Sequence, residues 1–184
     1  IGTLSTNCVA EFDGKHFVVG QGDIYVHNGV QKQSVIDGTM REYFFSTLKN
    51  TGLRRVFVVP DYANSEMWVC YPSSSSEDNS CDKALLWNWK DNTWTLRDLP
   101  DVFYGTYGVV NPQDPDYWDA DTNAWETDTT VWGSSKYNPV KLKLIFTSTK
   151  NDKVYLVGDI SLFDGVEFTS RLEKTGIYLG VDRG

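Results

Sequence analysis

The chain has 184 residues, a formal net charge of −8, and ordinary globular proportions of hydrophobic (40%) and charged (23%) residues. This composition excludes a disordered chain, and no apolar stretch is long enough for a membrane span. The net negative charge disfavours a surface that binds duplex nucleic acid, because such a surface needs clustered Lys and Arg. Seven Trp, ten Tyr and nine Phe favour β-strands. We expect a single β-rich domain over residues 1–184. Because the sequence opens without Met and already in a strand pattern, we expect it to be part of a longer polypeptide.

The first third predicts a hairpin followed by a helix. Residues 15–29 alternate apolar and polar side chains on both sides of a Gly-Gln-Gly turn, which is typical of paired strands. The period then changes, since Met40, Tyr43, Phe44 and Leu48 follow helical spacing. Asp37 can cap this short helix near 38–48, and Gly52 is its expected stop.

The middle of the chain predicts two further strand pairs. Residues 54–72 give two strands around the turn PDYANS, and the first of them, apolar on both faces, is expected to be internal to its sheet. The polar run from Ser73 to Asn79 is expected to be a solvated hairpin loop. Residues 81–100 then form a hairpin whose turn is KDNT.

The pattern is loop-like from Asp101 onwards, with a long loop near 110–138, and strands resume from residue 140. A weak internal echo relates residues 14–29 to residues 151–165. Similar hairpins that recur in one all-β chain are typical of propeller blades. The predicted fold class is therefore all-β, with antiparallel sheets that form part of a β-propeller and one short helix.

Few residues offer catalytic or metal chemistry, so we expect no enzyme and no cofactor. A nucleophile would need a base, and both available histidines, His16 and His27, are expected to be ordinary strand residues. The seven Glu are scattered, and no spacing selects a glycosidase pair. Three cysteines without metal-ligand spacing are expected to be free thiols.

One motif has alternating oxygen ligands, as calcium loops do: Asp119, Asp121 and Asn123. The match to an EF-hand then fails, because Ala124 stands where Gly is needed and Thr130 where the bidentate Glu is needed. A turn made by these side chains without metal is the favoured interpretation.

Three tryptophans surround the KDNT turn: Trp87, Trp89 and Trp94. They could stack on sugars, or on single-stranded nucleic acid if a basic groove were present, but the neighbouring charges are balanced. Adjacent positions on one face of paired strands favour a structural seam between packed sheets.

The stretch ALLWNWKDNTWTLRDLP resembles the end of a kelch-type propeller blade. More specifically, the chain is similar to the tail nozzle proteins of short-tailed bacteriophages, also called tail tubular protein B or stabilisation proteins. The resemblance is carried by HFVVGQGDIYVHNG, VIDGTMREYFF, SEMWVCYPS, CDKALLWNWKDNTWTLRDLP and YWDADTNAWETDTTVWG. The chain departs from that family in size, since the family's subunits are several times longer.

The resemblance implies a structural, non-enzymatic virion subunit that is assembled in the host cytoplasm. It implies a homo-oligomeric ring, a hexamer in the family, that contacts the tail adaptor and continues the DNA channel below the portal, with tail fibre or needle proteins as further partners. DNA would pass through without specific binding, which suits an acidic wall. The alternatives are a carbohydrate-binding propeller or sandwich of a viral receptor-binding protein and, less favoured, a glycosidase.

Exposed aromatic residues with polar rims are typical of interfaces. The candidate contact residues lie on the predicted helix and in the loop 111–132: Arg41, Phe45, Trp118, Trp125 and Trp132.

Overall fold

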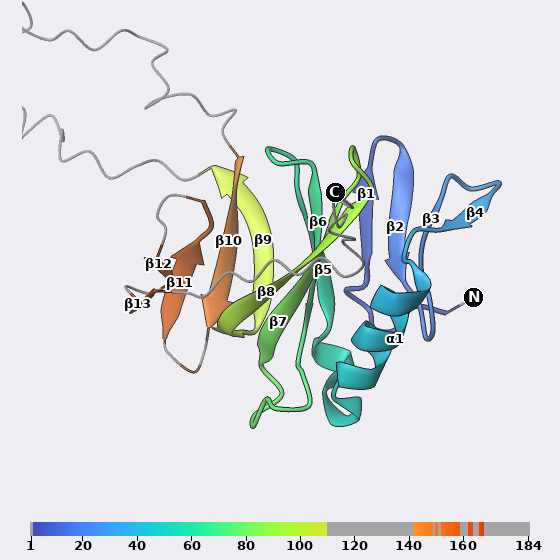
Figure 1. The fold of residues 1–184 in the computed structure, drawn as a ribbon. Helices are drawn as coiled ribbons and strands as arrows, with labels where there is room; N and C mark the ends of the chain where they lie inside the picture. Colours follow the sequence, from blue (N-terminus) through green and yellow to red (C-terminus); the bar gives the residue numbers. More distant parts are fainter. Residues whose placement is uncertain are drawn as a thin grey trace, which may run out of the picture.

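The computed structural model describes residues 2–109, 142–148, 150, 152–158, 162–163 and 166–167. In these residues every strand pairing is antiparallel, and the strands form two four-stranded sheets, one three-stranded sheet and one two-stranded ladder. The predicted all-β class with antiparallel sheets is therefore confirmed. The three larger sheets stand in a row, and the sheet β5–β8 lies between the other two (Figure 1).

The N-terminal sheet is an up-and-down meander in chain order. Its strands are β1 (Val9–Phe12), β2 (Lys15–Val19), β3 (Ile24–His27) and β4 (Lys32–Ser34). The first turn places Asp13 and Gly14 at positive φ, the backbone that tight hairpin turns require. The pairing of β2 with β3 confirms the hairpin predicted over 15–29.

The middle sheet has the same sequential order. Its strands are β5 (Phe57–Asp61), β6 (Glu66–Tyr71), β7 (Cys81–Asn88) and β8 (Thr93–Val102). These elements confirm both strand pairs predicted between residues 54 and 100.

The prediction that the first of these strands is internal is wrong. Strand β5 stands at the end of its sheet, although the side chains on both of its faces are largely buried. Its outer edge contacts β1 and the third sheet, and the Val58 amide donates a 2.8 Å hydrogen bond to the carbonyl of Asn7. Both faces of β5 are covered because a neighbouring sheet lies on each side. Apolar residues on both faces therefore did not require β5 to be a central strand of its own sheet.

The predicted helix is confirmed as α1 (Gly38–Thr47), and the Asp37 carboxylate caps it by accepting from the Met40 amide at 2.8 Å. The expected stop at Gly52 is wrong, because the helix ends at Thr47. The Lys49 amide donates to the carbonyl of Pro72, and the Ser74 amide donates to the carbonyl of Thr47, so the chain leaves the helix to join the β6–β7 loop. Gly52 lies in a 3-10 helix, η1 (Asn50–Arg55), which the sequence pattern did not predict. Neither helix has the length or apolarity needed to cross a membrane, so far as the described residues go.

The third sheet consists of β9 (Tyr104–Val109), β10 (Leu142–Ser148) and β11 (Lys153–Leu156), with β10 in the middle. Loop structure was predicted from Asp101, but β8 continues to Val102 and β9 follows at once, so that part of the prediction is wrong. The predicted loop 110–138 lies outside the described residues. A further ladder pairs β12 (Leu162–Phe163) with β13 (Val166–Glu167). Residues 151–165, which echo residues 14–29 in sequence, contribute β11 and β12 to different ladders. They therefore do not repeat the β2–β3 hairpin.

Two apolar layers hold the three sheets together. The first layer joins Phe17 and Ile24 of the N-terminal sheet to Met67 and Leu85 of the middle sheet, and α1 adds Phe44. The second layer lies on the opposite face of the middle sheet. Its buried members include Phe57, Trp68, Leu86, Leu144 and Phe146. Alternate residues of β6 and β7 therefore enter different cores.

Gly105 is needed where β9 approaches β10. A Cβ atom at this position would lie 2.5 Å from the ring of Phe146, closer than nonbonded carbons approach, and 3.0 Å from that of Phe57, which is a tight contact. We predict that Gly105→Ala lowers the free energy of unfolding by about 1–3 kcal/mol, because the buried ring must move. Chemical denaturation measures this change.

Gly108→Ala is the matched control in the same strand, since its Cβ would meet only Ile145, at 3.4 Å. Equal effects of the two substitutions would show that strand propensity, and not the contact with Phe146, sets the cost.

Candidate functional site

Trp87 lies in the seam between the N-terminal and middle sheets. Its side chain is only 5% exposed, and its ring stacks on Phe17 at 5.4 Å and meets the edge of Phe12 at 5.6 Å. The indole Nε1 donates to the Asn92 side chain at 3.0 Å, so burial leaves this polar atom paired. The contacts of Trp87 are those of inter-sheet packing.

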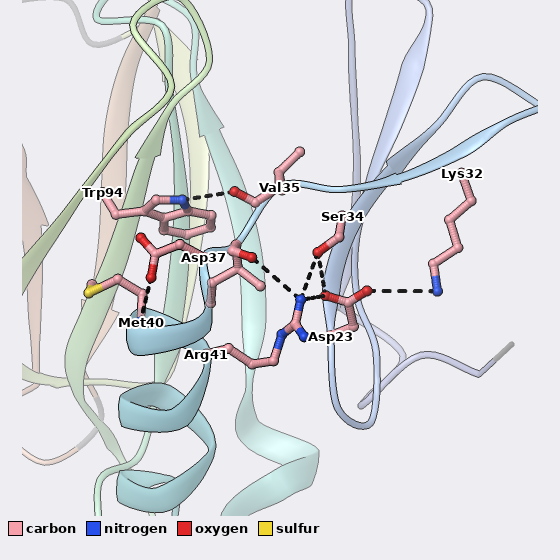
Figure 2. Close-up of polar contacts among 9 residues, drawn as sticks. Asp23, Lys32, Ser34, Val35, Asp37, Met40, Arg41 and Trp94 are labelled. Atoms are coloured by element: carbon pink, nitrogen blue, oxygen red, sulfur yellow. Dashed lines mark hydrogen bonds and ion pairs between the residues drawn. The ribbon is translucent and has the colours of Figure 1, made fainter.

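The other two seam candidates are half-buried. Trp94 stands opposite Trp87 across β7 and β8, with ring centroids 6.1 Å apart, and its Nε1 donates to the carbonyl of Val35 at 3.0 Å. Trp89 packs on Phe12 at 5.2 Å. Trp94 therefore ties the middle sheet to the segment that leads into α1 (Figure 2).

Arg41 fastens α1 to the N-terminal sheet (Figure 2). Its guanidinium donates to the Asp23 carboxylate at 3.1 Å, to the Ser34 hydroxyl at 2.9 Å and to the carbonyl of Ile36 at 3.4 Å. Asp23 also accepts from Ser34 at 2.7 Å and pairs with Lys32 at 3.9 Å. These bonds link α1 to β4 and to the residue before β3.

Of the two contact residues predicted on α1, both are engaged within the chain. Arg41 makes the bonds above, and Phe45 packs edge-on against Phe44 at 4.9 Å beside the first core. The outward side of the helix is formed instead by Glu42, Tyr43 and Ser46. Trp118, Trp125 and Trp132, and the calcium candidates Asp119, Asp121 and Asn123, lie outside the described residues.

Aromatic side chains from the middle and third sheets meet on the surface. Tyr62 follows β5 and lies 6.3 Å from Trp89, which follows β7, and 5.3 Å from Tyr107 of β9. We call Trp89, Tyr62 and Tyr107 the aromatic strip. Both tyrosines are 43% exposed.

The Tyr62 hydroxyl ties the aromatic strip to the N-terminal sheet by donating to the carbonyl of Glu11 at 3.0 Å. Partial burial, with added contributions from Tyr107 and from the acidic Glu11 and Asp13, raises the pKa of Tyr62. The hydroxyl therefore stays neutral. Neither Tyr62 nor Tyr107 was predicted to be a site residue. The one signal in the sequence was that Tyr62 lies inside a predicted turn.

The two histidines face each other across β2 and β3. His16 pairs directly with His27 in the strand register, and their rings stack at 5.0 Å with 17° between planes. Both were expected to be ordinary strand residues, and their pairing was missed. It could have been read from the hairpin, because both positions are equally distant from the Gly-Gln-Gly-Asp turn.

The predicted solvated loop is in part buried, so that prediction is wrong for two of its serines, Ser73 and Ser76. Ser80, which follows the predicted loop, is buried as well. The Ser73 amide and hydroxyl both donate to Asp82, and the Ser80 hydroxyl donates to Asp78 and Asp101. The Ser80 bond also lowers the pKa of Asp78. Local serine-to-carboxylate bonds order this loop, which composition alone describes as solvated.

The prediction of free thiols is confirmed for Cys8, Cys70 and Cys81, which are buried and unbridged. Burial raises the pKa of each thiol, so the thiols stay protonated and unreactive. In the described part of the chain, no cluster of three or more His, Cys, Asp or Glu is placed to hold a metal ion.

Comparison with protein-family models gives no match, and curated proteins give no significant match to this chain.

Burial distinguishes Trp87 from Trp89 energetically. We predict that Trp87→Ala lowers the free energy of unfolding by about 3–5 kcal/mol, because it leaves a cavity between two sheets. Denaturant titration of both variants measures the difference. Trp89→Ala, at the half-buried position directly after β7, is the control and should cost clearly less. Equal costs would contradict the assignment of Trp87 to the seam.

Proposed function

We propose that the three sheets are consecutive blades of a β-propeller. Propeller blades are four-stranded antiparallel sheets, and both β1–β4 and β5–β8 are four-stranded meanders in strict chain order. The third sheet repeats the meander over its three described strands. Each neighbouring pair of sheets packs face to face through one apolar layer.

The contacts between first strands support the same architecture. Strand β1 contacts β5, and β5 contacts β9, so the leading strands of the three sheets are neighbours. In a propeller the blades are arranged radially around a central channel, so the leading strand of each blade lies beside those of the adjacent blades. A two-sheet sandwich does not place the first strands of three successive sheets next to one another.

We further propose that the chain is a structural part of a short-tailed phage tail, of the nozzle type. The observation that carries this proposal is where the resembling stretches fall. Four of the five lie within described residues and form the β2–β3 hairpin, α1, β6 and the β7–β8 hairpin. These elements build the first core and the Arg41 cluster, so the resemblance covers a packed unit and not scattered surface loops.

In this proposal the subunit acts by forming a ring that DNA passes through. Each ring contact is heterologous, and the rotation between subunits must close. The net charge of −8 suits a channel wall, because like charges keep the DNA backbone from adhering within about 8–10 Å in physiological salt. The adaptor and the other subunits would be met by outward elements such as the Glu42, Tyr43 and Ser46 side of α1.

The oligomeric state of the full-length polypeptide tests the proposal. We expect native mass spectrometry and negative-stain images to show a closed ring, and Glu42→Arg with Tyr43→Ala to reduce the ring fraction. Val30→Ser, at a 91% exposed turn position, is the control and should leave the ring intact. A full-length chain that stays monomeric at micromolar concentration, and is not located on the axis of a tail particle, would overturn the proposal.

The aromatic strip favours one second function, carbohydrate binding. Sugar rings pack on aromatic faces, and the strip offers two half-exposed tyrosines and Trp89 beside the acidic Glu11 and Asp13. The nearby negative charge selects neutral or amino sugars over acidic ones.

For this second function we predict specific signals on a glycan array that Tyr62→Ala abolishes. Tyr43→Ala, which removes a comparably exposed tyrosine on α1, should leave them unchanged. Absence of any glycan signal, or equal loss in both variants, would contradict a sugar site on the strip.

A further inference from the structure

The chain has two histidines in 184 residues, and the fold brings them together. His16 lies on β2 and His27 on β3, in direct register and on the same face of the sheet. His16 is exposed and His27 half-exposed, so solvent ions can reach both rings. The ring centroids are 5.0 Å apart, close enough for one nitrogen of each imidazole to reach a shared ion after side-chain rotation.

We propose that His16 and His27 form a surface site for one divalent transition-metal ion of the zinc, nickel or copper class. Imidazole nitrogen is a preferred ligand of these borderline ions, whereas magnesium and calcium require oxygen ligands. Two protein ligands leave the remaining coordination positions to water. The site is therefore an open one that also accepts a donor from another molecule.

The polar neighbours permit a cation at this place. Glu11 stands opposite His16 in the register of β1 and β2 and adds negative charge to the same row of the sheet. Lys32 stands opposite His27, but its ammonium is drawn aside, 4.0 Å from the centroid of the Tyr25 ring and 3.9 Å from the Asp23 carboxylate. The positive charge of Lys32 is thus already paired with Asp23 and Tyr25.

Binding has one identifiable local cost. The Nδ1 atom of His27 accepts a hydrogen bond from the Gly29 amide at 3.3 Å, so in the neutral ring the proton is on Nε2. Coordination through Nε2 moves that proton to Nδ1 and releases the Gly29 bond. The bond is long, exposed and local, so its loss costs little compared with two metal–nitrogen bonds.

An ion held by both rings would join β2 to β3 and stabilise the hairpin. A ligand that binds only the folded chain raises its apparent stability by mass action. The two rings also bind cooperatively in the chelate sense, because the second ligand is already at high effective concentration once the first has bound.

Zinc and nickel titrations of tag-free protein test this inference. We expect one ion per chain by calorimetry and a higher melting temperature with ZnCl2 or NiCl2 but not with MgCl2. His16→Gln and His27→Gln should each weaken binding on the order of 100-fold, since either leaves a single ligand. Lys15→Gln, at an exposed position next to His16, is the matched control and should bind as the parent does.

Two outcomes would overturn the inference. One is the absence of any calorimetric signal or thermal shift with millimolar zinc or nickel. The other is binding that persists in the His16→Gln/His27→Gln double variant, which would assign the ion to other groups. Circular dichroism of the apo variants checks that each glutamine protein is folded, so that loss of binding is not loss of structure.

Discussion

Burial of both faces of the sheet β5–β8 is the constraint on which the rest of the structure depends. Residues of β6 alternate between two cores: Met67 and Val69 face the N-terminal sheet, while Trp68 and Cys70 face the third sheet. A sheet that is apolar on both faces gains its hydrophobic stabilisation only when both neighbours are in place. The stacking of three sheets therefore follows from the strand pattern of the middle one.

The polar groups at the seams are arranged to permit this burial. Trp87 and Trp94 place their indole nitrogens on Asn92 and on the carbonyl of Val35, and the Ser73 loop folds onto Asp82. Three atoms are exceptions within the described residues, since Arg41 Nε, Trp68 Nε1 and the Tyr71 hydroxyl are buried without a hydrogen-bond partner. Burial raises the pKa of Tyr71, and the nearby Thr47 hydroxyl offsets this only in part. The neutral forms required by the core are thus maintained.

Sequence periodicity predicted the elements whose signals are local. The β2–β3 hairpin, the Asp37-capped helix and the β7–β8 hairpin all depend on residues close together in the chain. The errors arose where contacts distant in sequence decide the outcome. Pro72 and Ser74 end α1 before Gly52, and neighbouring sheets bury β5 at the edge of its own sheet. The ring of Phe146 leaves no room for a side chain at Gly105, in a segment that was predicted to be a loop.

In the candidate site, too, local contacts could be predicted from the sequence and contacts distant in sequence could not. Trp87 could be placed in a seam from alternation alone, because its partner Trp94 lies seven residues away on the same hairpin. The aromatic strip could not, since it joins residues 62, 89 and 107 through the packing of two sheets. The histidine pair lies between these cases: the hairpin register contains it, but only when chemistry and pairing are considered together.

Native-state hydrogen exchange measures whether the middle sheet supports both of its neighbours. We expect the amides of β6 and β7 to exchange most slowly among the described residues and to open only with global unfolding, because both cores must be lost first. The outer strands β4 and β11 should exchange earlier. Faster exchange in β6 and β7 than in either neighbouring sheet would show that the middle sheet does not support its neighbours.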